Sequence, residues 1–178
     1  MQPGRKRTLT HDLVIALGKG WRRGNETDGP ALAVTGPRGG QTMSARSELE
    51  VLIVEDRQVM LKIIRRLLVQ LGYAKVDEAA NGLQALEHIR QKRYDLILSD
   101  WNMDGMSGFD LLKVVRADPE TRETPFILVT AESKPENILA AKAAGASGYL
   151  LKPFKLDVLE KTLDSVLAAS GFVTLAVA

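Results

Sequence analysis

Cysteine is absent from the 178-residue chain, which excludes a disulfide framework and a thiolate metal site. Histidine occurs only at His11 and His88, and this spacing argues against a histidine-based metal cluster. No apolar run approaches the roughly 20 residues that a membrane-spanning helix needs. The stretch Leu13 to Leu17 is too short for the core of a signal peptide, and His11 and Asp12 lie beside it. We therefore expect a protein without a membrane span that works in the cytoplasm.

A strong excess of charge of one sign is also missing, although the charge is unevenly distributed. The formal net charge is +2. Residues 1–46 carry eight Lys and Arg against three Asp and Glu, whereas residues 47–178 carry 16 against 19. The main part of the chain is therefore mildly acidic, and the sequence pI of about 8.9 does not indicate a nucleic-acid-binding protein.

Residues 1–46 lack the periodicity of a helix or a strand. Glycine and proline recur in "GKGWRRGNETDGPALAVTGPRGGQ", a composition that predicts a disordered basic extension. Two other interpretations remain open. The extension could bind an anionic surface through its basic residues, or Met43 could be the natural start of the protein. The basic residues in question are Arg5, Lys6, Arg7, Arg22 and Arg23.

From residue 49 onward, apolar runs alternate with segments of helical periodicity. The runs are apolar rather than alternating, which favours strands covered on both faces. Right-handed crossovers between such strands give an α/β fold with an open, doubly wound parallel sheet. We expect this domain to span residues 47–170, followed by a short apolar tail over 171–178. The expected strands are 49–54, 74–79, 94–99, 125–130 and 148–152, and the expected helices are 59–72, 83–92, 107–118, 134–145 and 155–170.

Polar groups follow four of these strands directly. The first strand ends at Glu55 and Asp56, the third at Asp100, the fourth at Thr130 and the fifth at Lys152. Each residue alone has an ordinary structural explanation, as a helix cap, a strand residue or a solvated lysine. Together they converge on one edge, because open α/β sheets place such groups beyond the carboxyl ends of their strands.

The mixture of groups at this edge is chemically coherent. Three carboxylates held close together repel one another, and a divalent cation relieves that repulsion. Oxygen ligands without histidine or cysteine select Mg²⁺ or Mn²⁺. A lysine and a threonine hydroxyl can bind the oxygens of a phosphoryl group. The sequence therefore predicts a phosphoryl-transfer site in which one carboxylate is free to act as the nucleophile.

Residues 49–167 resemble the receiver domain of bacterial two-component response regulators, and most closely its stand-alone chemotaxis form, the CheY type. The stretches that carry the resemblance occur in the family's order and spacing. The resemblance implies a flavodoxin-like sheet of five strands in the order 2-1-3-4-5 with five helices. The matching stretches are "LIVEDRQVMLKIIRRLL", "ILSDWNM", "LLKVVRAD", "VTAES" and "ENILAAKAAGASGYLLKPF".

The resemblance also implies roles for individual residues. Asp100 is implied to be the phosphoacceptor, Thr130 the switch hydroxyl and Lys152 the lysine that pairs with the phosphoryl group, with a cis bond to Pro153. Tyr149 is implied to be the aromatic residue whose rotamer reports activation, although a half-buried strand aromatic would also fit. The implied Mg²⁺ ligands are Glu55, Asp56, Asp100 and the backbone carbonyl of Asn102.

Two further positions, Asn102 and Glu132, match residues that tune dephosphorylation in the family. The sequence departs from the family pattern at two points. Asp104 stands where the family usually has proline, which predicts a looser and more acidic loop after Asp100. Glu55 is longer than the more usual aspartate, which bears on metal affinity.

The function implied is that of a phosphorylation-controlled switch rather than a conventional enzyme, although the domain catalyses its own phosphorylation and dephosphorylation. The implied partners are a sensor histidine kinase and a downstream protein such as the flagellar motor switch, bound through residues 134–145, 148–152 and 155–170. An alternative is a single-domain phosphorelay intermediate or phosphate sink. A remote alternative is a Mg²⁺-dependent aspartyl-phosphate phosphatase, but those enzymes carry their nucleophile in a D-x-D motif after the first strand.

Overall fold

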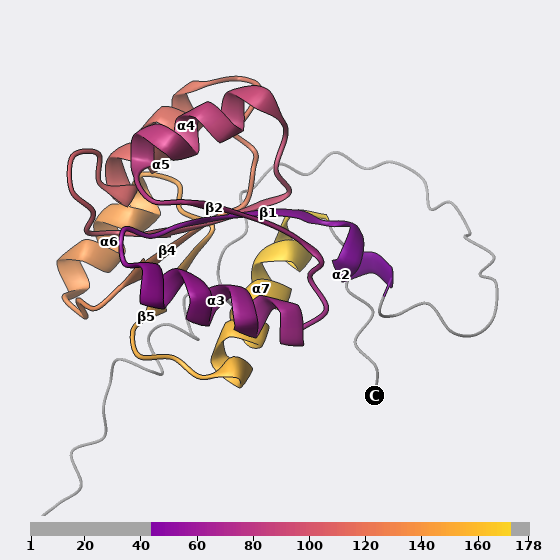
Figure 1. Ribbon diagram of the computed structural model, residues 1–178. Helices are drawn as coiled ribbons and strands as arrows, with labels where there is room; N and C mark the ends of the chain where they lie inside the picture. Colours follow the sequence, from indigo (N-terminus) through magenta and orange to yellow (C-terminus); the bar gives the residue numbers. More distant parts are fainter. Residues whose placement is uncertain (1–43, 172–178) are drawn as a thin grey trace, which may run out of the picture.

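The computed structural model describes residues 44–171 (Figure 1). Residues 1–43 of the expected disordered basic extension over 1–46, and residues 172–178 of the apolar tail, lie outside the described residues. The last residues of that extension, from Ser44 to Arg46, are not disordered as expected but begin a short helix. The described part forms one five-stranded sheet with helices on both faces (Figure 1). None of the described helices is long and apolar enough to span a bilayer.

Strands and helices alternate along the described chain as the sequence pattern predicts. The strands are β1 (Glu50–Val54), β2 (Lys75–Ala79), β3 (Leu96–Asp100), β4 (Phe126–Thr130) and β5 (Gly148–Leu151). The helices are α2 (Ser44–Glu48), α3 (Gln58–Gln70), α4 (Gly82–Gln91), α5 (Gly108–Ala117), α6 (Pro135–Ala143) and α7 (Leu156–Ala169).

All strand pairs in the sheet are parallel, and the strand order is β2-β1-β3-β4-β5. This confirms the predicted doubly wound, flavodoxin-like topology. The order reverses at β1, which has β2 on one side and β3 on the other. A reversal of this kind opens a crevice at the carboxyl ends of the two strands, and ligands of open α/β sheets bind there.

Two apolar cores sandwich the sheet because successive strand residues face opposite sides. In β1, Val51 and Ile53 pack into the core under α3 and α7, whereas Leu52 and Val54 pack into the core under α4, α5 and α6. Figure 1 shows these two helical layers on opposite faces of the sheet. Burial on both faces explains why the strands are continuous apolar runs.

Two details differ from the sequence pattern. Ile63 has helical spacing with the apolar residues of α3, but its side chain is 45% exposed, and Leu61 is buried instead. The short helix α2 has no apolar periodicity, yet Arg46 attaches it to the domain. The Arg46 guanidinium lies 3.0 Å from Glu160 and 2.7 Å from Asp164, both on α7.

Candidate functional site

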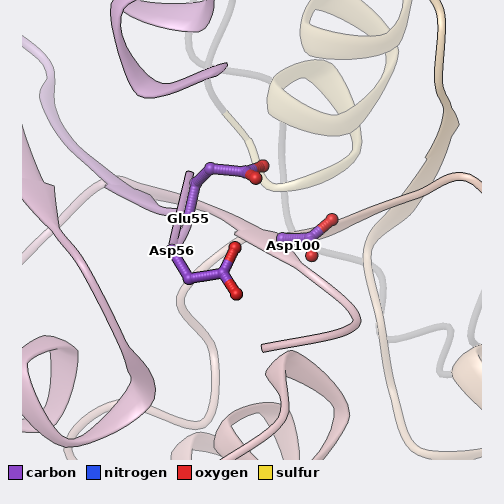
Figure 2. A group of neighbouring side chains, drawn as sticks. All are labelled: Glu55, Asp56 and Asp100. Atoms are coloured by element: carbon purple, nitrogen blue, oxygen red, sulfur yellow. The ribbon is translucent and has the colours of Figure 1, made fainter. Parts of the chain in front are cut away.

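Three carboxylates meet where the strand order reverses. Glu55 and Asp56 directly follow β1, and Asp100 is the last residue of β3. One oxygen from each carboxylate lies within 4.8 Å of the others. Figure 2 shows the three side chains as neighbours, with Asp100 beside the consecutive residues Glu55 and Asp56. The predicted convergence of acidic groups at this edge is therefore present.

Backbone hydrogen bonds fix the ends of the strands that carry these groups. The Glu55 N–H donates to the carbonyl of Ala79 at 3.0 Å, so β1 stays paired with β2 for one residue beyond the strand. The Lys152 N–H donates to the carbonyl of Thr130 at 2.7 Å. The Lys152–Pro153 bond is cis, as expected. The functional side chains thus start from a rigid sheet edge rather than from long loops.

The ammonium of Lys152 reaches into the acidic cluster. Its Nζ lies 2.5 Å from Oε2 of Glu55 and 2.6 Å from Oδ1 of Asp100. The Lys152 side chain is only 10% exposed. Charge-assisted hydrogen bonds in such a dry position are strong, because little water competes for the partners.

Glu55 is the most deeply buried of the three acids, with 0% of its surface exposed. Burial raises the pKa of its carboxyl, and the charges of Asp100 and Asp56 raise it further, while Lys152 opposes the shift. The second carboxylate oxygen of Glu55, Oε1, has no hydrogen-bond partner within the described part of the chain. A buried oxygen without a partner is costly unless something else binds it.

These observations fit a hard divalent cation. The available donors are carboxylate oxygens, which suit Mg²⁺, Mn²⁺ or Ca²⁺. When all are ionised, three acids and one lysine leave a local charge of −2, which one divalent ion neutralises. A buried oxygen of Glu55 is free to ligate. The three carboxylates therefore fit a divalent cation in donor chemistry and in spacing.

The first turn of α5 packs closely against the backbone of Asp100. A Cβ atom added at Gly108 would lie 1.9 Å from the backbone carbonyl oxygen of Asp100 and 2.6 Å from Oγ of Ser99. The Gly108 N–H donates to the carbonyl of Trp101 at 3.0 Å. Only glycine allows this contact, which holds the loop after β3 against the first turn of α5.

Thr130 and Tyr149 each form a hydrogen bond with the backbone of Glu132. Thr130 is buried, and its Oγ1 accepts a hydrogen bond of 3.1 Å from the Glu132 N–H. The Tyr149 hydroxyl donates to the backbone carbonyl of Glu132 at 2.8 Å. The Tyr149 side chain is buried, and burial raises the pKa of its phenol. The backbone of Glu132 thus connects the predicted switch hydroxyl with the predicted reporter aromatic.

Asn102 and Glu132 lie at the outer rim of the site. Asn102 Nδ2 contacts Oε1 of Glu132 at 3.4 Å, which joins the loops after β3 and β4. The sequence pattern missed Asn137 on α6, whose Nδ2 donates to Oε2 of Glu132 at 2.8 Å. Asp104, the residue that replaces the family's usual proline, is exposed and lies outside the three-carboxylate cluster.

Trp101, directly after Asp100, is partly exposed, and an aromatic contact that the sequence did not indicate orients it. Its ring stacks on Phe109 of α5, with centroids 4.8 Å apart and an interplanar angle of 9°. It also meets Tyr149 edge-on at 6.2 Å. Nothing in the spacing of residues 101 and 109 signals the stack, because it depends on how the loop turns into α5.

The fold and the site together define a flavodoxin-like α/β protein with a carboxylate and lysine cluster at its switch point. Residues 51–164 match the family model of the response regulator receiver domain, and the chain belongs to this family. It is 42% identical over 118 residues to the chemotaxis protein CheY-3 of Vibrio cholerae, an alignment that covers 66% of this chain and 91% of that protein. Receiver domains are signalling switches of two-component systems rather than conventional enzymes.

Solved structures agree with this assignment. The chemotaxis protein CheY4 of Vibrio cholerae superimposes with a TM-score of 0.63 at 39% identity, covering 67% of this chain and 98% of that one. The receiver domain of a sensor histidine kinase from Pseudomonas aeruginosa gives a TM-score of 0.61 at 32% identity, covering 69% and 98%. That structure holds a magnesium ion in its active-site cleft.

Proposed function

We propose that Asp100 accepts a phosphoryl group from a phosphohistidine of a sensor histidine kinase. A carboxylate oxygen of Asp100 forms a bond to phosphorus while the bond from phosphorus to the imidazole nitrogen breaks, and the electron pair stays on that nitrogen. The observation that carries this proposal is the position of Asp100 among Glu55, Asp56 and Lys152 at the switch point. The domain supplies the positioning and the charge for its own phosphorylation.

We also propose that Glu55, Asp56, Asp100 and the backbone carbonyl of Asn102 hold Mg²⁺. When bound, the ion offsets negative charge on the carboxylates and on the incoming phosphoryl oxygens. The free Oε1 of Glu55 and the local charge of −2 support this assignment. The Lys152 ammonium, already 2.6 Å from Asp100, supplies a second positive charge at the same place.

The phosphoryl group changes the balance of contacts around β4 and β5. Its negative charge attracts the Thr130 hydroxyl and the Lys152 ammonium, which in the present structure bond to Glu132 and to the acids. Because Tyr149 is tied to Glu132, movement at Thr130 reaches β5. Two packings of this region, biased by phosphorylation, constitute the switch.

The signal leaves the domain through protein contact on the surface formed by α6, β5 and α7. The resemblance to CheY-type chemotaxis proteins supports a role in a chemotaxis phosphorelay in the cytoplasm, with a target such as the flagellar motor switch. Receiver domains of histidine kinases are among the structural neighbours, so a phosphorelay intermediate or phosphate sink is the second candidate.

Labelling with a small phosphodonor tests the central assignment. With Mg²⁺ present, the full chain should gain one acid-stable, base-labile acyl phosphate, and Asp100→Asn should abolish the label. Asp104→Asn, which removes an exposed acid four residues further on, is the matched control and should label normally. Labelling of Asp100→Asn at the level of the unchanged protein would refute the proposal.

A phosphorylation-dependent binding experiment separates the two candidate roles. The full chain is immobilised with and without a phosphoryl mimic and presented with a purified motor-switch protein and with a histidine phosphotransfer domain. A chemotaxis effector should bind the motor-switch protein more tightly in its phosphorylated form. Phosphoryl exchange with the phosphotransfer domain, without binding to the motor protein, would favour the phosphorelay role.

A further inference from the structure

All the polar groups of Glu132 are engaged in hydrogen bonds, and they link four other residues. Its N–H donates to Thr130 and its carbonyl accepts from Tyr149. Its carboxylate accepts from Asn102 through Oε1 and from Asn137 through Oε2. Asn137 is the partner to which the function proposed above gives no role.

The two contacts of the Glu132 carboxylate differ in strength. The hydrogen bond from Asn137 is 2.8 Å long, whereas the one from Asn102 is 3.4 Å, near the limit for such a bond. Lys134 Nζ lies 4.0 Å from the same Oε2 and is itself well exposed. Asn137 therefore makes the shortest polar contact of the Glu132 carboxylate, whose side chain is 42% exposed.

We infer that Asn137 is a positioning residue that holds the Glu132 carboxylate beside Asn102 and thereby sets the rate at which phosphorylated Asp100 is hydrolysed. This inference rests on the proposed function. Asn137 lies in the first turn of α6, the helix that begins at Pro135. The helix thus gives the Glu132 side chain a fixed anchor that the loop after β4 does not provide.

The hydrolysis step uses the restrained carboxylate. A water molecule bound beside Glu132 and Asn102 attacks phosphorus, and its oxygen forms the new bond as the bond to the Asp100 oxygen breaks. The electron pair stays on the Asp100 carboxylate. The proton that the water loses passes to the Glu132 carboxylate and then to solvent, so the products are the free carboxylate and inorganic phosphate.

The decay of the phosphorylated protein tests the inference. The full chain is labelled with a small radioactive phosphodonor, the donor is removed, and loss of the label is followed with Mg²⁺ present. Asn137→Asp keeps the shape of the side chain but replaces the donor with a carboxylate that repels Glu132, and Asn137→Ala removes the amide without adding charge. Both should slow the decay by roughly three- to tenfold, since positioned proton transfer contributes more than this in total.

Two comparisons distinguish positioning from a general structural effect. Glu136→Gln, in the same turn of α6 and exposed, should decay at the unchanged rate. In a Glu132→Ala background, Asn137→Asp should have no further effect, because its partner is gone. Thermal unfolding of each variant confirms that it is folded, and Asn137→Ala replaces Asn137→Asp if the latter is not.

The outcomes separate the two proposals. If the unchanged chain never gains a label on Asp100, both the proposed function and this inference fail. If the label forms but decays equally fast with and without Asn137, this inference alone is overturned. An equal slowing in the presence and absence of the Glu132 carboxylate would also overturn it, since Asn137 would then act by another route.

Discussion

The ammonium of Lys152 lies 2.5 Å from Oε2 of Glu55, although the two residues are 97 positions apart in the chain. Glu55 follows β1, and Lys152 follows β5 at the edge of the sheet. The Lys152 side chain extends from the β5 edge toward β1 and also contacts Asp100 at the end of β3. This pair therefore joins strands that do not touch each other and stabilises a buried negative charge.

Replacing Lys152 with methionine should destabilise the protein in the absence of Mg²⁺. The change leaves the buried Glu55 carboxylate without its cation, and breaking a buried pair in this way costs about 3–5 kcal/mol. Chemical denaturation at neutral pH measures the change. Lys161→Met, an exposed lysine of α7, is the control and should change the free energy of unfolding by less than about 0.5 kcal/mol. Equal stability of the two variants would mean that the pair is not significant for folding.

The pH dependence of stability should identify Glu55. Its pKa in the folded protein is raised above the ordinary value of 4.5, mainly by burial, so the folded state holds the proton more tightly than the unfolded state. The resulting stabilisation is complete below pH 4.5 and is lost as the pH rises through the raised pKa. Without Mg²⁺, the unfolding free energy of the unchanged protein should therefore fall with rising pH relative to that of Glu55→Gln. If the difference in unfolding free energy between the two proteins were constant from pH 4 to pH 7.5, it would contradict the raised pKa of Glu55.

Magnesium binding should depend on Asp56 but not on Asp104. Both acids are exposed, yet only Asp56 belongs to the three-carboxylate cluster. Asp56→Asn should weaken Mg²⁺ binding by at least about tenfold, because even partners outside the ligand shell contribute this much. Trp101, which lies between Asp100 and Asn102 in the sequence, provides the fluorescence signal in a Trp21→Phe background, where it is the only tryptophan. Asp104→Asn should bind Mg²⁺ with the affinity of the parent protein. An equal loss of Mg²⁺ affinity in both variants would indicate nonspecific attraction of the ion to acidic charge.

The fold and the cluster of charged groups could be predicted from the sequence because they follow from simple geometry. Apolar runs alternate with helical segments, and parallel strands bring their carboxyl ends to one edge. Glu55, Asp56, Asp100 and Lys152 each follow or end a strand, so their convergence required only the topology. Ile63 shares the helical spacing of the buried residues of α3 but is exposed, because spacing alone does not show how wide the buried stripe of the helix is.

The contacts that depend on side-chain rotamers could not be predicted. Asn137 reaches Glu132 across the turn into α6, and Phe109 meets Trp101 across the turn into α5. Both pairs are close in sequence, but neither spacing falls within a regular helix or strand, so no periodicity connects them. The ion pairs of Arg46 with α7 were missed for a related reason, because the five-residue helix α2 carries no apolar pattern.

Gly108 offers a test of how closely α5 must approach the site. A Cβ at this position would lie 1.9 Å from the carbonyl oxygen of Asp100, and backbone cannot move aside as a side chain can. Gly108→Ala should therefore cost about 1–3 kcal/mol or more of stability and should weaken Mg²⁺ binding, because the loop after β3 must shift. Gly82→Ala is the comparison with a less severe clash, since its added Cβ would lie 2.7 Å from Cγ, 2.8 Å from Cβ and 3.0 Å from the backbone oxygen of Met106. We expect Gly82→Ala to lose less stability than Gly108→Ala, as measured by denaturation. It should bind Mg²⁺ like the parent protein, as measured by Trp101 fluorescence. If Gly108→Ala instead matched the parent in both measurements, the contact between α5 and Asp100 would not be what positions the carboxylate.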